Sequence, residues 1–453
     1  MIPFNKPFLT GKEAHYIYKA VYAGKLSGNG FFTKKCQSYF ELRYGFKKCL
    51  LTTSCTDALE MCAILCGVEP GDEVIVPSYT FVSSALAFVR QGAKIVFADS
   101  YSDNPNIDPE QLESLITDKT KVIVPVHYAG IACDMDKIMK IANSHNIIVV
   151  EDAAQAIDSY YKERPLGSIG HMAAFSFHET KNIISGEGGL LAINDENFIH
   201  RAEIIWEKGT NRAEFFRGEV NKYGWVDTGS SFLPSEIIAA FLWAQIEHLD
   251  MIQNKRKELW NEYYKLLQPL AEQGCFSLPN IPDFATNNAH MFYLVCQNLN
   301  ERGKLINKLK EHDILSVFHY LSLHKSHYYI DKHDGRELVN SDKFSDCLVR
   351  LPMFYELKKQ QRVYHTKIAQ ASRRVRKENL SEKECEKILT SVRKWKKQVM
   401  ELELSYYEKW GKVLPASKII KVLEADRFFG RKMFNNMVHP RKGGKGPVPS
   451  KGR

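Results

Sequence analysis

The chain has 453 residues, 44% of them hydrophobic and 25% charged, which excludes a disordered chain and predicts two or more domains. No run of about 18 apolar residues occurs and no secretory leader is recognisable, so we expect a cytoplasmic protein with no membrane contact. The net charge of +9 is uneven, because residues 359–453 carry 25 Lys and Arg against 9 Asp and Glu, whereas residues 1–358 carry 37 against 44.

Short apolar runs alternate with helix-like segments through the first half of the chain. This βαβ rhythm predicts an α/β fold with a mainly parallel central sheet covered on both faces. The predicted strands lie near residues 72–79, 93–99, 121–128, 146–154, 172–177 and 189–194, and the predicted helices near residues 56–67, 82–92 and 134–146.

The pattern changes at about residue 250, where a long charged helix begins. We therefore predict a large domain over 1–249, a smaller α/β domain over 250–368 and a basic extension over 369–453. In the extension, apolar residues recur at steps of three and four between Cys385 and Tyr406, which predicts one amphipathic helix followed by a disordered end. Its acids alternate with its bases, which favours a solvated face over nucleic-acid binding.

Residues that follow the predicted strands are the place to look for chemistry, because open α/β sheets bind ligands beyond the carboxyl ends of their strands. Lys181 lies between two apolar runs, where desolvation would lower its pKa and make it a nucleophile. Asp152 ends another run. Alone, each has an ordinary explanation, a solvated loop lysine or a helix-capping acid. Together they match pyridoxal phosphate, which needs a carboxylate at its ring nitrogen and a lysine at its aldehyde.

The phosphate of such a cofactor needs hydrogen-bond donors. The segment "TTSCTDALEM" predicts a loop that enters a helix, with Thr53, Ser54 and Thr56 around the first turn. Free backbone N–H groups and hydroxyls there could bind an anion, although ordinary capping explains the same residues. Ser176 could add a hydroxyl, and Phe81 could cover the ring or simply pack in the core.

Six motifs in order resemble the DegT/DnrJ/EryC1/StrS nucleotide-sugar aminotransferases, which are pyridoxal-phosphate enzymes of fold type I. They are "TTSCTDAL", "PSYTFVSSALAF", "VHYAG", "VVEDAAQA", "FSFHETKNIISGEGG" and "GSSFLPSEIIAAFLWAQIE". The resemblance covers residues 2 to 358 approximately. It implies an aspartate aminotransferase-like fold with a smaller C-terminal α/β domain, to which a helical tail is appended.

Carried over by position, the resemblance makes Lys181 the catalytic lysine that also binds the cofactor covalently. It assigns Asp152 to the ring nitrogen and Gln155 to the phenolic oxygen, with Phe81 stacked on the ring. Phosphate contacts are implied for Ser54, Cys55 through its N–H, and Ser176. Ser231 stands where many members have an asparagine that reaches the phosphate of the neighbouring subunit.

The family resemblance also implies a homodimer with shared active sites, glutamate as amino donor and a nucleotide-linked keto sugar as acceptor. We expect the acceptor to be dTDP-4-keto-6-deoxyglucose, aminated at C4. Two alternatives remain: a different nucleotide-linked keto sugar, or a non-catalytic scaffold whose basic tail binds anions. His127, His178, His319 and His324 are given no catalytic role, because a structural hydrogen bond explains each equally well.

Overall fold

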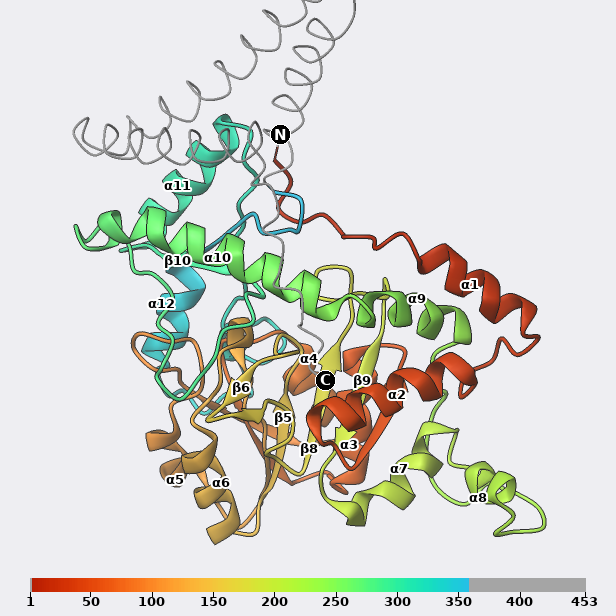
Figure 1. Cartoon of the computed structure of the whole chain (residues 1–453). Coiled ribbons are helices and arrows are strands. Elements are labelled where there is room, and N and C mark those ends of the chain that lie inside the picture. Colours follow the sequence, from red (N-terminus) through yellow and green to blue (C-terminus); the bar gives the residue numbers. More distant parts are fainter. Residues whose placement is uncertain (1, 358–453) are drawn as a thin grey trace, which may run out of the picture. The chain divides into compact units, whose positions relative to one another are not determined.

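A seven-stranded sheet lies at the centre of the molecule and helices cover both of its faces (Figure 1). The computed structural model describes residues 2–357, which belong to one compact unit. The predicted extension over 369–453 lies outside the described residues, and the division at residue 249 stays a prediction. None of the helices between residues 2 and 357 combines the length and apolarity of a membrane span.

The central sheet confirms the predicted mainly parallel arrangement. Its order is β1-β9-β8-β5-β4-β2-β3, and only β9 runs antiparallel to its neighbours. The six predicted runs form β2 to β5, β8 and β9, whereas β1 was not predicted. The strands are β1 (Lys48–Thr52), β2 (Glu73–Pro77), β3 (Lys94–Ala98), β4 (Thr120–Ile123), β5 (Ile148–Asp152), β8 (Met172–Ser176) and β9 (Gly189–Ile193).

Twelve α-helices and four 3-10 turns occur among the described residues. The α-helices are α1 (Glu13–Tyr22), α2 (Phe31–Tyr44), α3 (Cys55–Leu65), α4 (Ser83–Val89), α5 (Leu112–Leu115), α6 (Met135–Ser144), α7 (Ile199–Trp206), α8 (Arg212–Arg217), α9 (Glu236–Ile246), α10 (Leu249–Ala271), α11 (Leu299–Glu311) and α12 (Val339–Cys347). The 3-10 turns are η1 (Pro109–Gln111), η2 (Tyr128–Gly130), η3 (Glu196–Phe198) and η4 (Leu323–Lys325).

The sheet separates two hydrophobic layers, because successive side chains of a strand point to opposite faces. On β8, Ala173 and Phe175 join the core formed with α2, α6 and α9. Met172 and Ala174 join the core formed with α3, α4 and α7. Burial on both faces explains why these strands read as continuous apolar runs.

The chain after α9 builds a smaller substructure on the long helix α10. Its strands β10 (Phe292–Val295) and β11 (Leu348–Leu351) pair antiparallel, with Tyr293 opposite Arg350, and α11 and α12 pack beside them. A third, two-stranded sheet is formed by β6 (Tyr160–Tyr161) and β7 (Arg164–Pro165).

The N-terminal segment is held by residues from the far end of the described chain. Ile2 forms a bridge with Ile314, and the N–H of Met353 donates to the carbonyl of Phe4 at 3.3 Å. The ring of Phe8 stacks on Tyr355 with centroids 3.9 Å apart. The first residues therefore lie against segments that follow more than 300 residues later.

Candidate active site

The predicted site residues gather at one edge of the central sheet. Strands β1, β2, β5 and β8 run in the same direction, so their carboxyl ends meet at that edge. Asp152 ends β5 and Ser176 ends β8, while α3 starts three residues after β1. Lys181 follows β8 by five residues. The expected position of the site beyond the strand ends agrees with this arrangement.

Lys181 is held in a short loop between β8 and β9. The N–H of Phe177 donates to the carbonyl of Gly188 at 2.8 Å, and the N–H of Lys181 donates to the carbonyl of His178 at 2.9 Å. Burial lowers the pKa of Lys181; the nearby Cys55 and Asp152 oppose this shift, and the positive charge of Arg350 adds to it. The lysine is therefore more often unprotonated, and more nucleophilic, than a solvated one.

Asp152 is buried and fixed in orientation by its neighbours. Its Oδ2 accepts from Ser84 Oγ at 2.6 Å and its Oδ1 accepts from the N–H of Ala154 at 3.1 Å. The hydroxyl of Thr80 in turn lies 2.8 Å from that of Ser84. A carboxylate held in this way can place its charge against one ligand atom, as the ring nitrogen of pyridoxal phosphate requires.

Gln155 is also buried, and both ends of its amide group are engaged. Its Oε1 accepts from the N–H of Ala129 at 2.6 Å, and its Nε2 donates to the hydroxyl oxygen of Tyr320 at 2.9 Å. Tyr320 comes from the smaller substructure, so this contact joins the two parts of the chain at the site. Tyr320 could not be predicted as a site residue from the sequence, because 165 residues separate it from Gln155.

The start of α3 has the form of an anion site. Ser54 caps the helix, accepting from the N–H of Asp57 at 3.0 Å. The N–H groups of Cys55 and Thr56 lie in the first turn, where a helix has no internal acceptor for them. Gly189 of β9 presses against this turn, and a Cβ atom there would clash with the carbonyl of Ser54. The donors and the close backbone packing fit a phosphate group.

The other predicted residues lie around this centre. Ser176 is buried, and its Oγ accepts from the N–H of His178 at 3.4 Å. Phe81 is 55% exposed, and its ring lies 6.0 Å from that of Tyr320 at an angle of 43°. Ser231 is exposed, and the carbonyl of the adjacent Phe232 accepts from the N–H of Thr53 in the same chain. The roles assigned to these residues remain predictions.

A second carboxylate, Glu151, is buried completely next to Asp152. It lies 2.8 Å from His127 Nε2, and its two oxygens accept from the N–H groups of Gly167, Ile169 and Gly170 at 2.6–2.8 Å. Burial alone would raise the pKa of Glu151, but the hydrogen bonds from His127 and from the backbone hold it below its usual value. This agrees with the expectation that His127 has a structural hydrogen bond.

A network behind Lys181 fixes its neighbour Asn182. The amide nitrogen of Asn182 donates to Gln253 Oε1 at 2.7 Å and to the carbonyl of Asn288 at 2.9 Å. Its Oδ1 lies 2.9 Å from His290 Nδ1, which must therefore carry the proton. Burial lowers the pKa of His290 well below 6.5, and the charge of Lys181 adds to this effect.

The neutral state of His290 predicts a loss of stability in acid. Below a pH of about 6.5, the unfolded chain takes up a proton that the folded chain does not. The free energy of unfolding therefore decreases as the pH is lowered. We expect His290→Gln to reduce that fall between pH 6.5 and 5.5 by on the order of 1 kcal/mol. Urea unfolding at both pH values measures the difference. His200→Gln, at an exposed histidine, is the control, and equal slopes in both variants would contradict the prediction.

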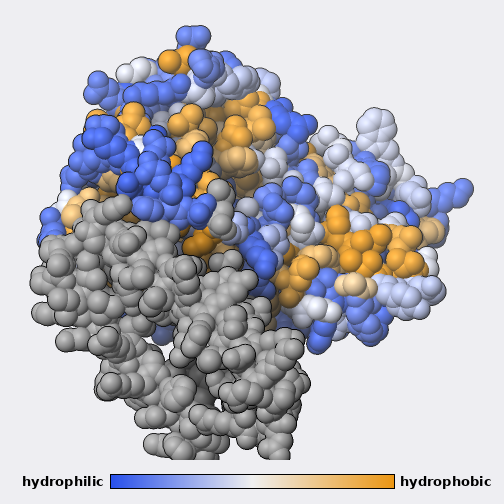
Figure 2. Space-filling model, turned by 90° about the horizontal axis from the view of Figure 1, so that it is seen from above, coloured by the Kyte–Doolittle hydropathy of each residue, from blue (hydrophilic) through white to orange (hydrophobic). Residues whose placement is uncertain are grey.

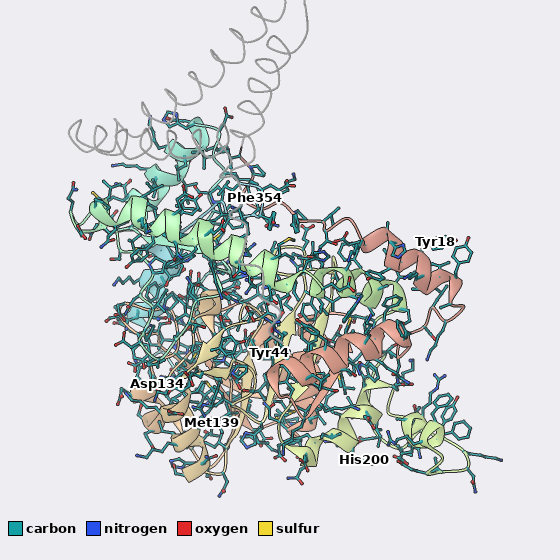
Figure 3. All side chains as sticks on the ribbon, viewed as in Figure 1. Tyr18, Tyr44, Asp134, Met139, His200 and Phe354 are labelled. Atoms are coloured by element: carbon teal, nitrogen blue, oxygen red, sulfur yellow. The ribbon has the colours of Figure 1, made fainter. Side chains whose placement is uncertain are left out.

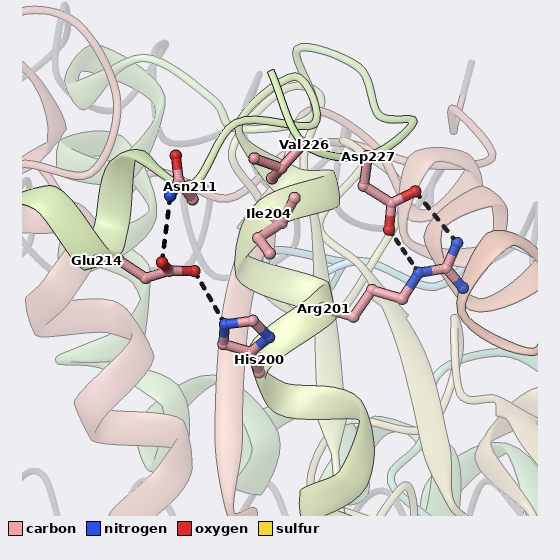
Figure 4. Close-up of a pocket in the computed structure, with 7 residues that line it drawn as sticks. All are labelled: His200, Arg201, Ile204, Asn211, Glu214, Val226 and Asp227. Carbon is pink, nitrogen blue, oxygen red and sulfur yellow. Dashed lines mark hydrogen bonds and ion pairs between the residues drawn. The ribbon is translucent and has the colours of Figure 1, made fainter. Parts of the chain in front are cut away.

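A separate hollow of about 390 Å³ lies between α7 and the segment around α8 (Figure 4). Its polar side chains pair with one another. His200 and Asn211 contact Glu214 at 2.9 and 3.2 Å, and Arg201 binds Asp227 at 2.7 Å. None of its lining residues was predicted as a site residue, and its charges are already matched. We assign it no ligand.

Comparison with known proteins identifies the family. The family model described as "DegT/DnrJ/EryC1/StrS aminotransferase family" matches residues 9–366. The spore coat polysaccharide biosynthesis protein SpsC of Bacillus subtilis (strain 168) is 33% identical over 362 residues, which cover 78% of this chain and 92% of SpsC.

Two solved structures share the fold. The putative sugar aminotransferase Spr1654 from Streptococcus pneumoniae superposes with a TM-score of 0.72 at 25% identity, covering 88% of this chain and all of Spr1654. DesV from S. venezuelae gives a TM-score of 0.73 at 28% identity, covering 80% and 95%. These matches confirm the predicted fold class and cofactor. The chain therefore belongs to the DegT/DnrJ/EryC1/StrS family and is a pyridoxal-phosphate-dependent sugar aminotransferase.

Proposed function

We propose that this enzyme transfers an amino group from glutamate to the C4 ketone of dTDP-4-keto-6-deoxyglucose. The product would be dTDP-4-amino-4,6-dideoxygalactose, a precursor of surface polysaccharide. The observation that carries the transfer chemistry is the arrangement of Lys181, with its lowered pKa, close to the fixed carboxylate of Asp152. The choice of sugar rests on the likeness of residues 208–236 to dTDP-4-amino-4,6-dideoxygalactose transaminase, and the similarity to SpsC, a spore coat polysaccharide biosynthesis protein, supports a polysaccharide pathway.

Different residues of the site bind the cofactor and transfer protons. Pyridoxal phosphate supplies an electron sink that carries the amino group between the two substrates. Asp152 would hold the ring nitrogen, and the first turn of α3 after Ser54 would hold the phosphate. Lys181 Nζ, whose pKa is lowered by burial, accepts the Cα proton of the donor. It later delivers a proton to C4 of the sugar from a fixed side, which sets the galacto configuration.

Separate half-reactions test this proposal. We expect glutamate to abolish the visible absorbance of the protein–cofactor complex and to yield 2-oxoglutarate, and dTDP-4-keto-6-deoxyglucose to restore that absorbance. The matched control is the UDP-linked form of the same keto sugar. Restoration by the UDP-linked form alone would refute the acceptor while leaving the donor intact. No response to glutamate would refute the donor assignment.

The proposed location is the cytoplasm. All nine cysteines among the described residues are free thiols, including the exposed Cys275. Unpaired cysteines at this number are typical of a reducing compartment.

We further propose that the enzyme acts as a homodimer. Large apolar side chains are exposed on α1, at the start of α2 and around α8: Tyr18, Tyr22, Phe31, Phe216 and Trp225. Tyr18 projects from α1 in Figure 3, and Figure 2 displays a broad hydrophobic area on the side where α1 lies. An exposed patch of this kind suits a protein interface. In such a dimer Ser231, close to the α8 segment, would face the phosphate of the partner.

If the enzyme is a homodimer with Trp225 in its interface, a charged side chain at this position should weaken self-association strongly. Trp225 is 85% exposed in the single chain. We expect Trp225→Glu to weaken self-association by about 30-fold or more, because buried tryptophans carry a large share of interface energy. Sedimentation velocity over a concentration series measures the change. Val339→Glu on α12, on the opposite side of the molecule in Figure 1, is the control. A wild-type protein that sediments as a monomer at all concentrations would refute the dimer.

A further inference from the structure

Tyr320 is fixed in position by contacts on two sides. Close to it in the chain, the N–H of Val317 donates to the carbonyl of Arg350 at 3.2 Å and the N–H of Arg350 donates back at 2.8 Å, so this segment lies alongside β11. The ring of Tyr320 stacks on the ring of His319 with centroids 3.5 Å apart, and His319 Nδ1 lies 2.6 Å from the hydroxyl of Tyr128. These contacts hold the hydroxyl of Tyr320 in place without a ligand.

The amide group of Gln155 is oriented by two contacts of opposite kind. The backbone N–H of Ala129 can only donate, so the atom that it contacts at 2.6 Å must be the amide oxygen, Oε1. The amide nitrogen, Nε2, carries two hydrogens, and one of them goes to the hydroxyl oxygen of Tyr320 at 2.9 Å. Among residues 2–357, Tyr320 is the one acceptor of this nitrogen, so its second hydrogen is available to a ligand. The backbone is fixed as well, because the carbonyl of Gln155 accepts from Asn288 Nδ2 at 2.8 Å.

The charged groups that act on this pair of side chains are Arg350 of β11 and Asp152 of β5. Burial raises the pKa of Tyr320; the charge of Arg350 opposes this shift and that of Asp152 adds to it. Burial lowers the pKa of the adjacent His319 well below 6.5, so neither ring changes its charge near neutral pH. Because Asp152 acts on Tyr320, the hydroxyl lies close to the carboxylate that is assigned to the ring nitrogen of the cofactor.

A donor at the phenolic oxygen of pyridoxal phosphate changes the acidity of the group that holds the cofactor. This oxygen is negative, and its charge stabilises a proton on the nitrogen that joins Lys181 to the cofactor. A hydrogen bond from Gln155 Nε2 draws part of that charge away, so the nitrogen loses its proton at a lower pH. Without the acceptor on Tyr320, the amide would be held at its oxygen alone. It could then turn about its last side-chain bond, which has a broad energy minimum, and the donor would no longer be aimed.

We propose that Tyr320 is a positioning residue, which holds the amide of Gln155 so that Nε2 donates a hydrogen bond to the phenolic oxygen of the cofactor. Tyr320 need not touch the cofactor to do this. The inference rests on one part of the proposed site, the assignment of Gln155 to the phenolic oxygen, and it is independent of the amino donor and of the sugar.

The visible absorbance of the holoenzyme tests this proposal, because its pH midpoint reports where the nitrogen at Lys181 loses its proton. Tyr320→Phe retains the ring but removes the acceptor. We expect the midpoint to rise by about 0.5–1, since a hydrogen bond to a charged oxygen is weakened rather than lost. Gln155→Ala, which removes the donor itself, should raise the midpoint at least as much. In the double variant, Tyr320→Phe should add no further rise, because it acts through Gln155.

Tyr328→Phe is the matched control, at a tyrosine further along the chain that is 62% exposed, and it should leave the midpoint unchanged. An unchanged midpoint in Tyr320→Phe or in Gln155→Ala would overturn the proposal, as would additive shifts in the double variant. Titration of each variant with pyridoxal phosphate adds a second readout: weaker cofactor binding in Tyr320→Phe with an unmoved midpoint would show a purely structural role. The midpoint is measured without substrate, so a failure of glutamate to react would refute the proposed donor and leave this test standing.

Discussion

Lys181→Ala is expected to lower the rate of amino transfer on the order of 10⁴-fold or more, the range found when a residue that acts as nucleophile and proton carrier is removed. The effect is large because one atom, Nζ, performs both tasks. The loop that holds it is fixed by backbone hydrogen bonds at Phe177 and Ser185, which do not involve the lysine side chain. The variant should therefore fold normally and lose only the chemistry.

Single-turnover kinetics with glutamate measure this loss, and the visible absorbance of the bound cofactor should change in the same variant. Lys140→Ala, at an exposed lysine of α6, is the control and should retain both properties. Addition of a small free amine should restore part of the rate in Lys181→Ala, because the proton-accepting group is then supplied from solution. Activity within tenfold of wild type would show that another group moves the proton.

Glu151→Ala is expected to reduce the free energy of unfolding by about 3 kcal/mol or more, because several buried donors would lose their acceptor at a cost of about 1–3 kcal/mol each. Alanine would leave the N–H groups of Gly167, Ile169 and Gly170 and the ring of His127 without their acceptor. Each buried donor left unpaired adds to the cost. Because Glu151 precedes Asp152 on β5, we also expect weaker cofactor binding.

Urea unfolding of both proteins with excess pyridoxal phosphate, at neutral pH, measures the difference. The matched control is Glu113→Ala, which removes an exposed carboxylate that also contacts a histidine, His145, at 3.0 Å. This control should change the free energy of unfolding by less than about 1 kcal/mol, as surface ion pairs do. If Glu151→Ala reduced the free energy of unfolding no more than Glu113→Ala does, other contacts would have to hold the loop 167–170 in place.

The parallel strands were predictable because a strand that is buried on both faces requires an unbroken run of apolar residues. β5 and β8 read as unbroken apolar runs for that reason, and the residues that follow them could be found by position alone. β1 escaped prediction because its run is short and begins and ends with polar residues, Lys48 and Thr52. Glu151 could have been found, since a carboxylate inside a strand that is buried on both faces must have internal partners.

Contacts between distant segments could not be predicted from one sequence. Tyr320 and Arg350 reach the site only because β10 and β11 pair and bring the segment 317–320 to Gln155. No local pattern marks either residue, because their positions depend on the packing of the smaller substructure. The roles of the family positions, Ser231 among them, came from resemblance and not from spacing.

The attachment of the N-terminal segment has a consequence for synthesis of the protein. Ile2 and Phe4 leave the ribosome well before their partners Ile314 and Met353, which are made more than 300 residues later. At about 5–20 residues per second, the apolar N-terminal segment waits for roughly 15–60 s before it can be covered. During this interval its apolar side chains stay uncovered, and closure of the compact unit is a step that begins only when translation of this unit is nearly complete.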